Sequence, residues 1–447
     1  MIHRWSAAAL AAALLASSLG AAAARGDDLD RSMMDYAFAR AQAQFYKATP
    51  DQTLLDGAVS GMRLAVSAMR GDPTKLPALH ARGNPAADTT ALNDELALAT
   101  SRFGKSVGER ELSYAAIKGM MDSLHDRWTV FMDPKEYAGL NEGLDGGNFP
   151  GVGVVIDVDP VTQSPQVVQT IDGGPAAKAG LEAGDLLVAV DGRQTRGLSI
   201  VQDSGLLRGK EGSTVTLTVS RKGQPDPLTF HIVRATIHVP SVLGSVIDGD
   251  VGYVRVSVFG STTGQELTNT LARLDAQGVK GYVLDLRDNG GGYLNAAIDV
   301  SSKFIPDGPI VSIDSRTQPI TTFDADATSV EMRPLAVLVN GFTASASEIT
   351  SGAIQDSGAG VIVGTRTFGK GVVQTIYPLP DGSAVKITTA RYLTPKGRDI
   401  NAIGIMPDIP VPDVNPADLG NPATDAQLQR AASYVESKIA PSTQQNS

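Results

Sequence analysis

The chain contains no cysteine. This absence excludes a disulfide framework, a thiolate metal site and a cysteine nucleophile together. Histidine is scarce as well: the five in 447 residues are His3, His80, His125, His231 and His238. A Ser-His-Asp site needs a histidine beside its nucleophile, and no H-E-x-x-H string occurs, so neither that triad nor a zinc protease site is favoured. We expect no metal and no cofactor, and we interpret His231 and His238 as ordinary residues at strand edges.

Positive charge and long apolar runs are also in short supply. The chain has 38 Lys and Arg against 48 Asp and Glu, a formal net charge of -10, which disfavours a nucleic-acid partner. The apolar run at residues 7–19 follows Arg4 and precedes small residues at 22–24. This pattern predicts a signal peptide over residues 1–24 and export to the periplasm or cell envelope, or secretion. The alternative is an uncleaved anchor, for which the run is short.

The length of the chain and the pattern of its apolar residues predict a multidomain α+β protein. More than one domain is expected because 447 residues exceed what one hydrophobic core usually organises. Apolar residues first recur three and four apart, as in helices. Short β-branched runs between Gly and Pro turns come next, with one helix expected at 200–207, and then strands alternate with helices. The expected domains are a signal peptide (1–24), a helical N-terminal domain (25–147), a β-rich domain (148–235), an α/β core with a largely parallel sheet (236–412), and an extended segment with a helix (413–447).

One strand-turn-helix pattern could carry chemistry. An apolar strand at residues 335–339 runs through a short turn into a helix that begins at Ser345. The unpaired N–H groups and positive dipole end of such a helix suit it to holding a developing oxyanion. The alternative is that Ser345 or Ser347 only caps the helix, with Glu348 in its first turn.

Two further motifs are each ambiguous alone. Lys370 stands between two glycines at the foot of a strand. It could be a solvated lysine, or a lysine in an apolar site whose neutral amine takes a proton from a serine, with Gln374 orienting it. The three glycines at 290–292 follow another strand and allow close approach of backbone to a substrate, but they are equally typical of a flexible turn.

Together these motifs resemble one family. The strings D-L-R-D-N-G-G-G, T-A-S-A-S-E-I and F-G-K-G-V-V-Q, in this order after a small β module, resemble the C-terminal processing peptidases, or tail-specific proteases. The resemblance runs from about residue 112 to 410 and implies a catalytic core of crotonase-like type. It implies that Ser345 is the nucleophile, Lys370 the general base and Gln374 its orienter, with the N–H groups of Ala346 and Gly291 as the oxyanion hole.

The same resemblance makes the β-rich domain PDZ-like. Its F-P-G-V-G-V segment matches the loop in which N–H groups, here of Val152, Gly153 and Val154, receive a peptide's terminal carboxylate. The implied partners are protein or peptide substrates with free, apolar C-termini. An adaptor protein and a homo-oligomer stay open.

Rival functions are less well supported. A G-x-S-x-G string occurs at 104–108, but no apolar strand precedes it, so we interpret it as a loop and not as a nucleophile elbow. The serious alternative is an inactive PDZ-bearing scaffold or peptide-binding protein of the cell envelope. Because Ser345, Lys370 and Gln374 all have the required residue types, a serine endopeptidase acting through an acyl-enzyme is the favoured function.

Overall fold

A computed structural model describes residues 26–144, 149–159, 161–171, 173–329 and 332–439, so the predicted signal peptide lies outside the described residues. The chain forms two compact units, one from the described part of 1–42 with 50–125, and one from 43–49 with 126–439. Within the described ranges, no helix is long and apolar enough to cross a bilayer.

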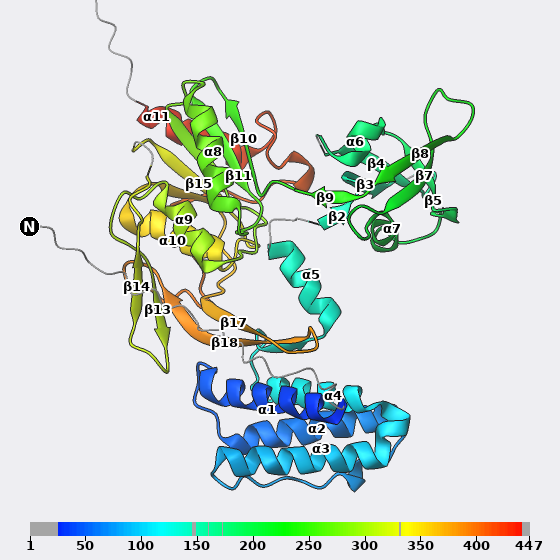
Figure 1. Cartoon of the computed structure of the whole chain (residues 1–447). Coiled ribbons are helices and arrows are strands. Elements are labelled where there is room, and N and C mark those ends of the chain that lie inside the picture. The colour runs from blue at the N-terminus through cyan, green and yellow to red at the C-terminus, as the bar shows by residue number, and fades with distance from the viewer. Residues whose placement is uncertain (1–25, 145–148, 160, 172, 330–331, 440–447) are drawn as a thin grey trace, which may run out of the picture. The chain divides into compact units, whose positions relative to one another are not determined.

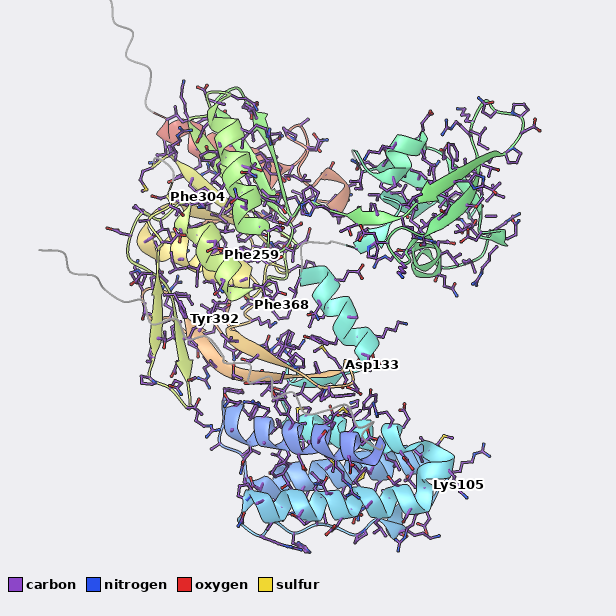
Figure 2. The ribbon with its side chains drawn as sticks, viewed as in Figure 1. Lys105, Asp133, Phe259, Phe304, Phe368 and Tyr392 are labelled. Atoms are coloured by element: carbon purple, nitrogen blue, oxygen red, sulfur yellow. The ribbon has the colours of Figure 1, made fainter. Side chains whose placement is uncertain are left out.

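The first unit is built of helices α1 (Gly26–Gln44), α2 (Asp51–Ala68), α3 (Pro85–Val107) and α4 (Glu109–Asp122), with a short 3-10 helix η1 (Pro73–Lys75). Helices α2 and α4 pack backbone to backbone, since a Cβ added to Gly61 would lie 1.9 Å from the Ala115 carbonyl oxygen. The G-x-S-x-G string forms the last turn of α3 and is helical, not the predicted loop; exposed Lys105 marks it in Figure 2. A nucleophile elbow is absent there in either case.

The β-rich module has an antiparallel sheet in the order β3 (Val154–Val158), β4 (Pro165–Thr170), β5 (Leu186–Val190), β7 (Thr214–Ser220), β8 (Leu228–Val233), with β6 (Arg193–Gln194) on β5. Helix α7 (Ile200–Leu207) has the predicted bounds, and a second short helix, α6 (Pro175–Ala179), was not predicted. Strand β2 (Phe149–Gly151) pairs with β9 (Ala235–Ile237). Among the described strands, β3 pairs with β4 alone, so its other edge has no strand partner in the described ranges.

The α/β core has a sheet in the order β10 (Val242–Ile247), β11 (Val251–Val256), β12 (Gly281–Asp285), β15 (Leu335–Val339), β16 (Val361–Gly364), β19 (Ile409–Pro410). Only β10 is antiparallel to its neighbour. Helices α8 (Thr263–Asp275), α9 (Leu294–Ser302) and α10 (Ala346–Ser357) cover one face, where Phe259 and Phe304 are buried (Figures 1 and 2). Because both faces are covered, β15 is buried throughout, as its unbroken apolar run predicts.

Helix α11 (Ala426–Lys438) covers the other face of this sheet, after the short 3-10 helix η2 (Pro416–Asp418). Arg287 is 1% exposed and lies between two buried carboxylates. Its guanidinium donates to Asp285 at 2.6 and 2.9 Å and to Asp425 at 2.7 and 3.0 Å. Asp425 caps α11 by accepting the Leu428 N–H. The segment from 413, predicted as a separate region, thus packs into the core.

A second, antiparallel sheet was not predicted. It has the order β1 (Val130–Met132), β18 (Ala384–Leu393), β13 (Pro309–Ser315), β14 (Thr321–Asp324), with β17 (Val372–Pro378) also paired to β18. Because β1 pairs with β18, the helical unit ends at His125 and not at the predicted 147. Helix α5 (Pro134–Leu144) follows β1 in the second unit.

Candidate active site

The predicted site residues lie at the carboxyl ends of three neighbouring parallel strands, where ligands bind in open α/β sheets. The glycine loop follows β12, the serine loop follows β15 and the lysine loop follows β16. The Ala344 N–H donates to the Asn289 carbonyl at 3.0 Å, and the Phe368 N–H donates to the Thr343 carbonyl at 3.0 Å. These bonds hold the three loops together.

Ser345 has the strained backbone expected of a nucleophile on a sharp turn. Its φ of 58° and ψ of -118° place a non-glycine residue in a region that few residues adopt. Ser347 is fully buried and donates its hydroxyl to the Asn289 carbonyl at 2.9 Å, so it is already engaged. Ser345 is the N-cap of α10, and its N–H donates to Glu348 at 2.9 Å, so the capping alternative describes a bond that is present. Capping does not exclude reactivity, and Ser345 is the serine that lines the cavity described below.

Of the two N–H groups predicted to form the oxyanion hole, one is free within the described residues and the other is already hydrogen-bonded. The Ala346 N–H, at the first position of α10, has no acceptor in the described part of the chain. The Gly291 N–H donates to the Asn289 side-chain oxygen at 2.8 Å. A Cβ on Gly291 would lie 2.8 Å from the Ala346 nitrogen and from the Ser345 Cβ. Gly291 thus lies beside Ser345, but its N–H already donates to the Asn289 side chain.

Glu348 joins the serine loop to the lysine loop. Its buried carboxylate accepts the backbone N–H groups of Ser345 at 2.9 Å, Gly369 at 2.7 Å and Lys370 at 2.8 Å, and the Thr367 hydroxyl at 2.5 Å. Burial raises the pKa of Glu348, and these four hydrogen bonds act in the opposite direction. A residue predicted only as part of a helix cap therefore fixes both catalytic candidates.

Lys370 has the electrostatic environment of a base. Its pKa is lowered to about 8, chiefly by burial and next by the charge of Lys386. Arg127 lowers it further, whereas the carboxylates of Glu348 and Asp126 raise it. An ordinary lysine is almost fully protonated near neutral pH, but a pKa of about 8 leaves a usable fraction as neutral amine.

The Lys370 amine is not hydrogen-bonded to Ser345 in the part of the chain that the structure describes. Its Nζ lies 4.5 Å from the centroid of the Trp128 ring. Within the described residues, no hydrogen bond joins Nζ to the Ser345 hydroxyl, and the Gln374 side-chain amide donates to the Val372 carbonyl at 3.2 Å. The three predicted catalytic side chains share one cavity but are not hydrogen-bonded to each other here.

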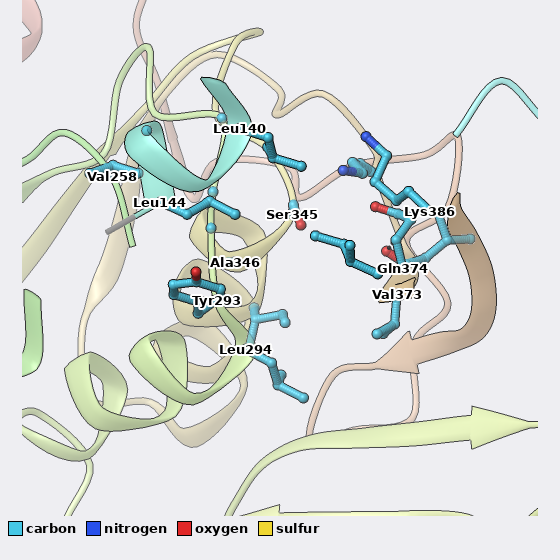
Figure 3. Close-up of a pocket in the computed structure, with 18 of the residues that line it drawn as sticks. Leu140, Leu144, Val258, Tyr293, Leu294, Ser345, Ala346, Val373, Gln374 and Lys386 are labelled. Atoms are coloured by element: carbon cyan, nitrogen blue, oxygen red, sulfur yellow. Dashed lines mark hydrogen bonds between the residues drawn. The ribbon is translucent and has the colours of Figure 1, made fainter. Parts of the chain in front are cut away.

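That cavity has a volume of about 670 Å³ and holds Ser345, Lys370, Gln374 and the three glycines in its wall. Figure 3 shows Ser345 between Leu140 and Leu144 of α5 and Gln374 of β17. The remaining wall is largely apolar, with Val258, Ile349 and Val373 among its residues.

His231 lies in β8, and His238 follows the end of β9. His231 contacts the Thr216 hydroxyl at 3.1 Å on the neighbouring strand, and His238 lies 3.0 Å from the Glu266 carboxylate. In the part of the chain that the structure describes, no group of three or more His, Asp or Glu could hold a metal ion.

The β-rich module offers free backbone donors at the predicted loop. The N–H groups of Val152 and Gly153 have no acceptor among the described residues, while the Val152 carbonyl accepts the Ala176 N–H at 2.8 Å. Gly153 has φ of 79°, which turns the chain before β3 begins at Val154. The Val152 side chain itself is buried in the module's core, so only its backbone is available.

Several residues of the site were not predicted. Trp128, Asn289, Lys386 and Tyr392 come from four separate stretches, and the Tyr392 hydroxyl donates to the Ser345 carbonyl at 3.2 Å. Only Asn289 lies inside a motif that the sequence singled out. The other three are recognised only when β1 and β18 are placed beside the lysine loop.

Comparison with known proteins gives family matches for both parts of the second unit. Residues 250–411 match Peptidase family S41, and residues 166–221 match the PDZ domain. A carboxyl-terminal-processing protease of Synechocystis sp. is 36% identical over 337 residues, which are 74% of this chain and 78% of that protein. A carboxy-terminal-processing protease of Bartonella bacilliformis is 40% identical over 309 residues, 68% of this chain and 70% of that protein. The solved photosystem II D1 C-terminal processing protease is 32% identical, with a TM-score of 0.48 over 87% of this chain and 95% of that one.

Proposed function

Since this chain belongs to the carboxyl-terminal-processing proteases of peptidase family S41 and carries a PDZ domain, we propose that it cuts peptide bonds with Ser345 as nucleophile and Lys370 as general base. The observation that supports this pair best is a lysine of lowered pKa, about 8, in the same cavity as a serine with strained backbone. Ser347 is excluded as nucleophile by its hydrogen bond to the Asn289 carbonyl.

The chemistry follows from these two groups. The neutral Lys370 amine takes the Ser345 hydroxyl proton while Oγ attacks the carbonyl carbon of the peptide bond. The C–N bond then breaks, and the Lys370 ammonium returns its proton to the leaving amine, which leaves an ester on Ser345. A water molecule, deprotonated by Lys370, hydrolyses the ester and restores the serine.

The negative charge on the carbonyl oxygen needs donors that are already aligned. We assign the Ala346 N–H as one of them, because it is free and lies at the positive end of the α10 dipole. Gly291 supplies the second N–H once that group leaves the Asn289 side chain, and Gln374 orients Lys370 once its amide leaves the Val372 carbonyl. In this proposal, the two hydrogen bonds to the Asn289 side chain and the Val372 carbonyl belong to a resting state.

Substrate tails bind to the PDZ domain in this proposal. The free N–H groups of Val152 and Gly153, with that of Val154, receive the terminal carboxylate, and the peptide pairs with the open edge of β3. Docking of a tail draws Lys370 from Trp128 toward Ser345, so chains with a free C-terminus are cut first.

We predict that kcat/KM rises with pH through about 8, because Lys370 acts only after it loses its proton. The active fraction falls tenfold for each pH unit below this midpoint, so activity at about pH 6 is about 100-fold below the plateau. Measuring kcat/KM against pH on a peptide without ionisable side chains tests this rise in activity with pH. A flat profile over the same range would exclude Lys370 as the base.

We also predict that a peptide with an amidated C-terminus is cut about tenfold more slowly than the same peptide with a free carboxylate. The amide keeps a carbonyl oxygen that can accept from the N–H groups of Val152 and Gly153 but loses the negative charge. A hydrogen bond to a charged group contributes about 1.5–3 kcal/mol and a neutral one about 1 kcal/mol, so the difference corresponds to about tenfold. A peptide acetylated at its N-terminus is the control and keeps its rate. Equal kcat/KM for the amide and the acid would count against recognition of the carboxylate.

A further inference from the structure

Building on Lys370 as the proposed base, we propose that Lys386 is a positioning residue that keeps the Lys370 amine neutral by holding a second positive charge in the same cavity. Lys386 lies in β18 and pairs in register with Ile376 of β17. Both Lys386 and Lys370 line the 670 Å³ cavity that contains Ser345. Figure 3 shows the Lys386 side chain next to Gln374 at the end of the cavity opposite α5.

The pairing of β18 with β17 explains how Lys386 reaches the site. Lys386 lies opposite Ile376 and Thr388 lies opposite Gln374, so Lys386, Ile376 and Gln374 share one face of the sheet, and all three line the cavity. The register shifts between Thr388 and Ala390, so this alternation does not continue to Tyr392. Strand β18 thus places an ammonium group in the wall of the cavity that holds Ser345.

The acidic groups around this cavity are committed elsewhere. Asp126 accepts hydrogen bonds from the hydroxyls of Thr129 and Thr388, and the Glu348 carboxylate accepts the four donors described above. Among the described residues that line the cavity there is no Asp, Glu or His. The Lys386 ammonium makes no ion pair or hydrogen bond within the described part of the chain, although the backbone of Lys386 is paired in the sheet. Arg127 adds a third positive charge, 4.4 Å from the Trp128 centroid.

Two ammonium groups without a shared carboxylate repel each other, so the pair loses its first proton at lower pH than a single lysine does. The pKa of Lys386 is itself lowered by burial, and the charge of Lys386 is the second largest cause of the lowered pKa of Lys370. Since Lys370 is the proposed base, the form in which Lys370 is neutral and Lys386 is charged is the productive one.

The experiment is a set of kcat/KM profiles against pH for the full chain and the variants Lys386→Met, Lys386→Arg and Lys396→Met. Methionine keeps the apolar stem of Lys386 without its charge, so we expect the midpoint to rise by about one pH unit and the activity at neutral pH to fall about tenfold, with the plateau at high pH retained. Arginine restores the charge and returns the midpoint toward wild type. Lys396 is exposed outside the cavity, and its loss removes the same net charge without moving the midpoint.

Other results overturn the proposal. An unchanged midpoint with a uniformly lower rate assigns Lys386 a structural role only. A rise in KM confined to substrates with acidic residues near the cut, again without a shifted midpoint, assigns it to substrate binding. Lys386→Gln is the second variant if the methionine variant does not fold. If kcat/KM of the wild type does not rise with pH near 8, the assignment of Ser345 and Lys370 fails. This result is distinct from failure of the Lys386 proposal, in which the wild type shows the rise and the variants do not shift it.

Discussion

Ser345→Ala lowers kcat/KM toward an unfolded protein by about a thousandfold or more, because no other hydroxyl in the described cavity stands at the α10 terminus with a free N–H beside it. Lys370→Met has an effect of similar size, and the double variant is no worse than either single one, since the two groups act as a unit. Active-site titration and steady-state kinetics on the same preparations measure both effects.

Ser347→Ala is the matched control for this result. Ser347 lies two residues on and is buried, so the variant loses one hydrogen bond to the Asn289 carbonyl but no nucleophile, and we expect a loss of a few fold, about 1 kcal/mol. Turnover by Ser345→Ala at the wild-type rate would contradict the assignment. Tail binding without any turnover in wild type would instead favour the inactive scaffold.

Gly291→Ala is expected to lower kcat by roughly a hundred- to a thousandfold, the usual effect of disturbing one oxyanion donor. The added Cβ would lie 2.8 Å from the Ala344 carbonyl oxygen, the Ala346 nitrogen and the Ser345 Cβ, so the nucleophile's own turn must shift. The φ of 101° at Gly291 adds strain for any residue with a side chain. KM changes less than kcat, because the disturbed groups act on the transition state.

Gly290→Ala is the control for this prediction. Gly290 is exposed and has no positive φ, and no atom lies within 4 Å of a Cβ added to it. We expect nearly wild-type activity and an unchanged melting temperature. If Gly291→Ala and Gly290→Ala are equally active, the proposed oxyanion site is wrong.

The sequence predicts those parts of the site that follow from local pattern. The apolar run of β15 predicts a buried strand, and the structure has one. The short turn after it predicts a helix that begins near Ser345, which the structure has as α10. Helix α7 and the bounds of β15 match the predicted ranges for the same reason. The motifs that resemble the family lie in loops whose ends are set by such elements.

Contacts between residues that are far apart in the sequence could not be predicted from local sequence patterns. Nothing around residue 130 indicates that β1 pairs with β18, and this pairing brings Trp128 next to Lys370 and shifts the end of the helical unit to His125. From the sequence alone, Lys386 is typical of a solvated lysine on a strand. Its place in the cavity wall is recognised only from the structure. The engagement of the Gly291 N–H by Asn289 likewise depends on a side-chain rotamer, which no motif specifies.

The buried guanidinium of Arg287 also ties the end of the chain to the site. Asp425 is 138 residues further along the chain, whereas Arg287 lies three residues before the first glycine of the glycine loop. Loss of Asp425 would leave Arg287 with Asp285 and remove two hydrogen bonds from a buried cation. We therefore expect a chain truncated before Asp425, and so before α11, to hold the segment that carries its glycine loop less firmly, although every residue of the cavity wall is still present.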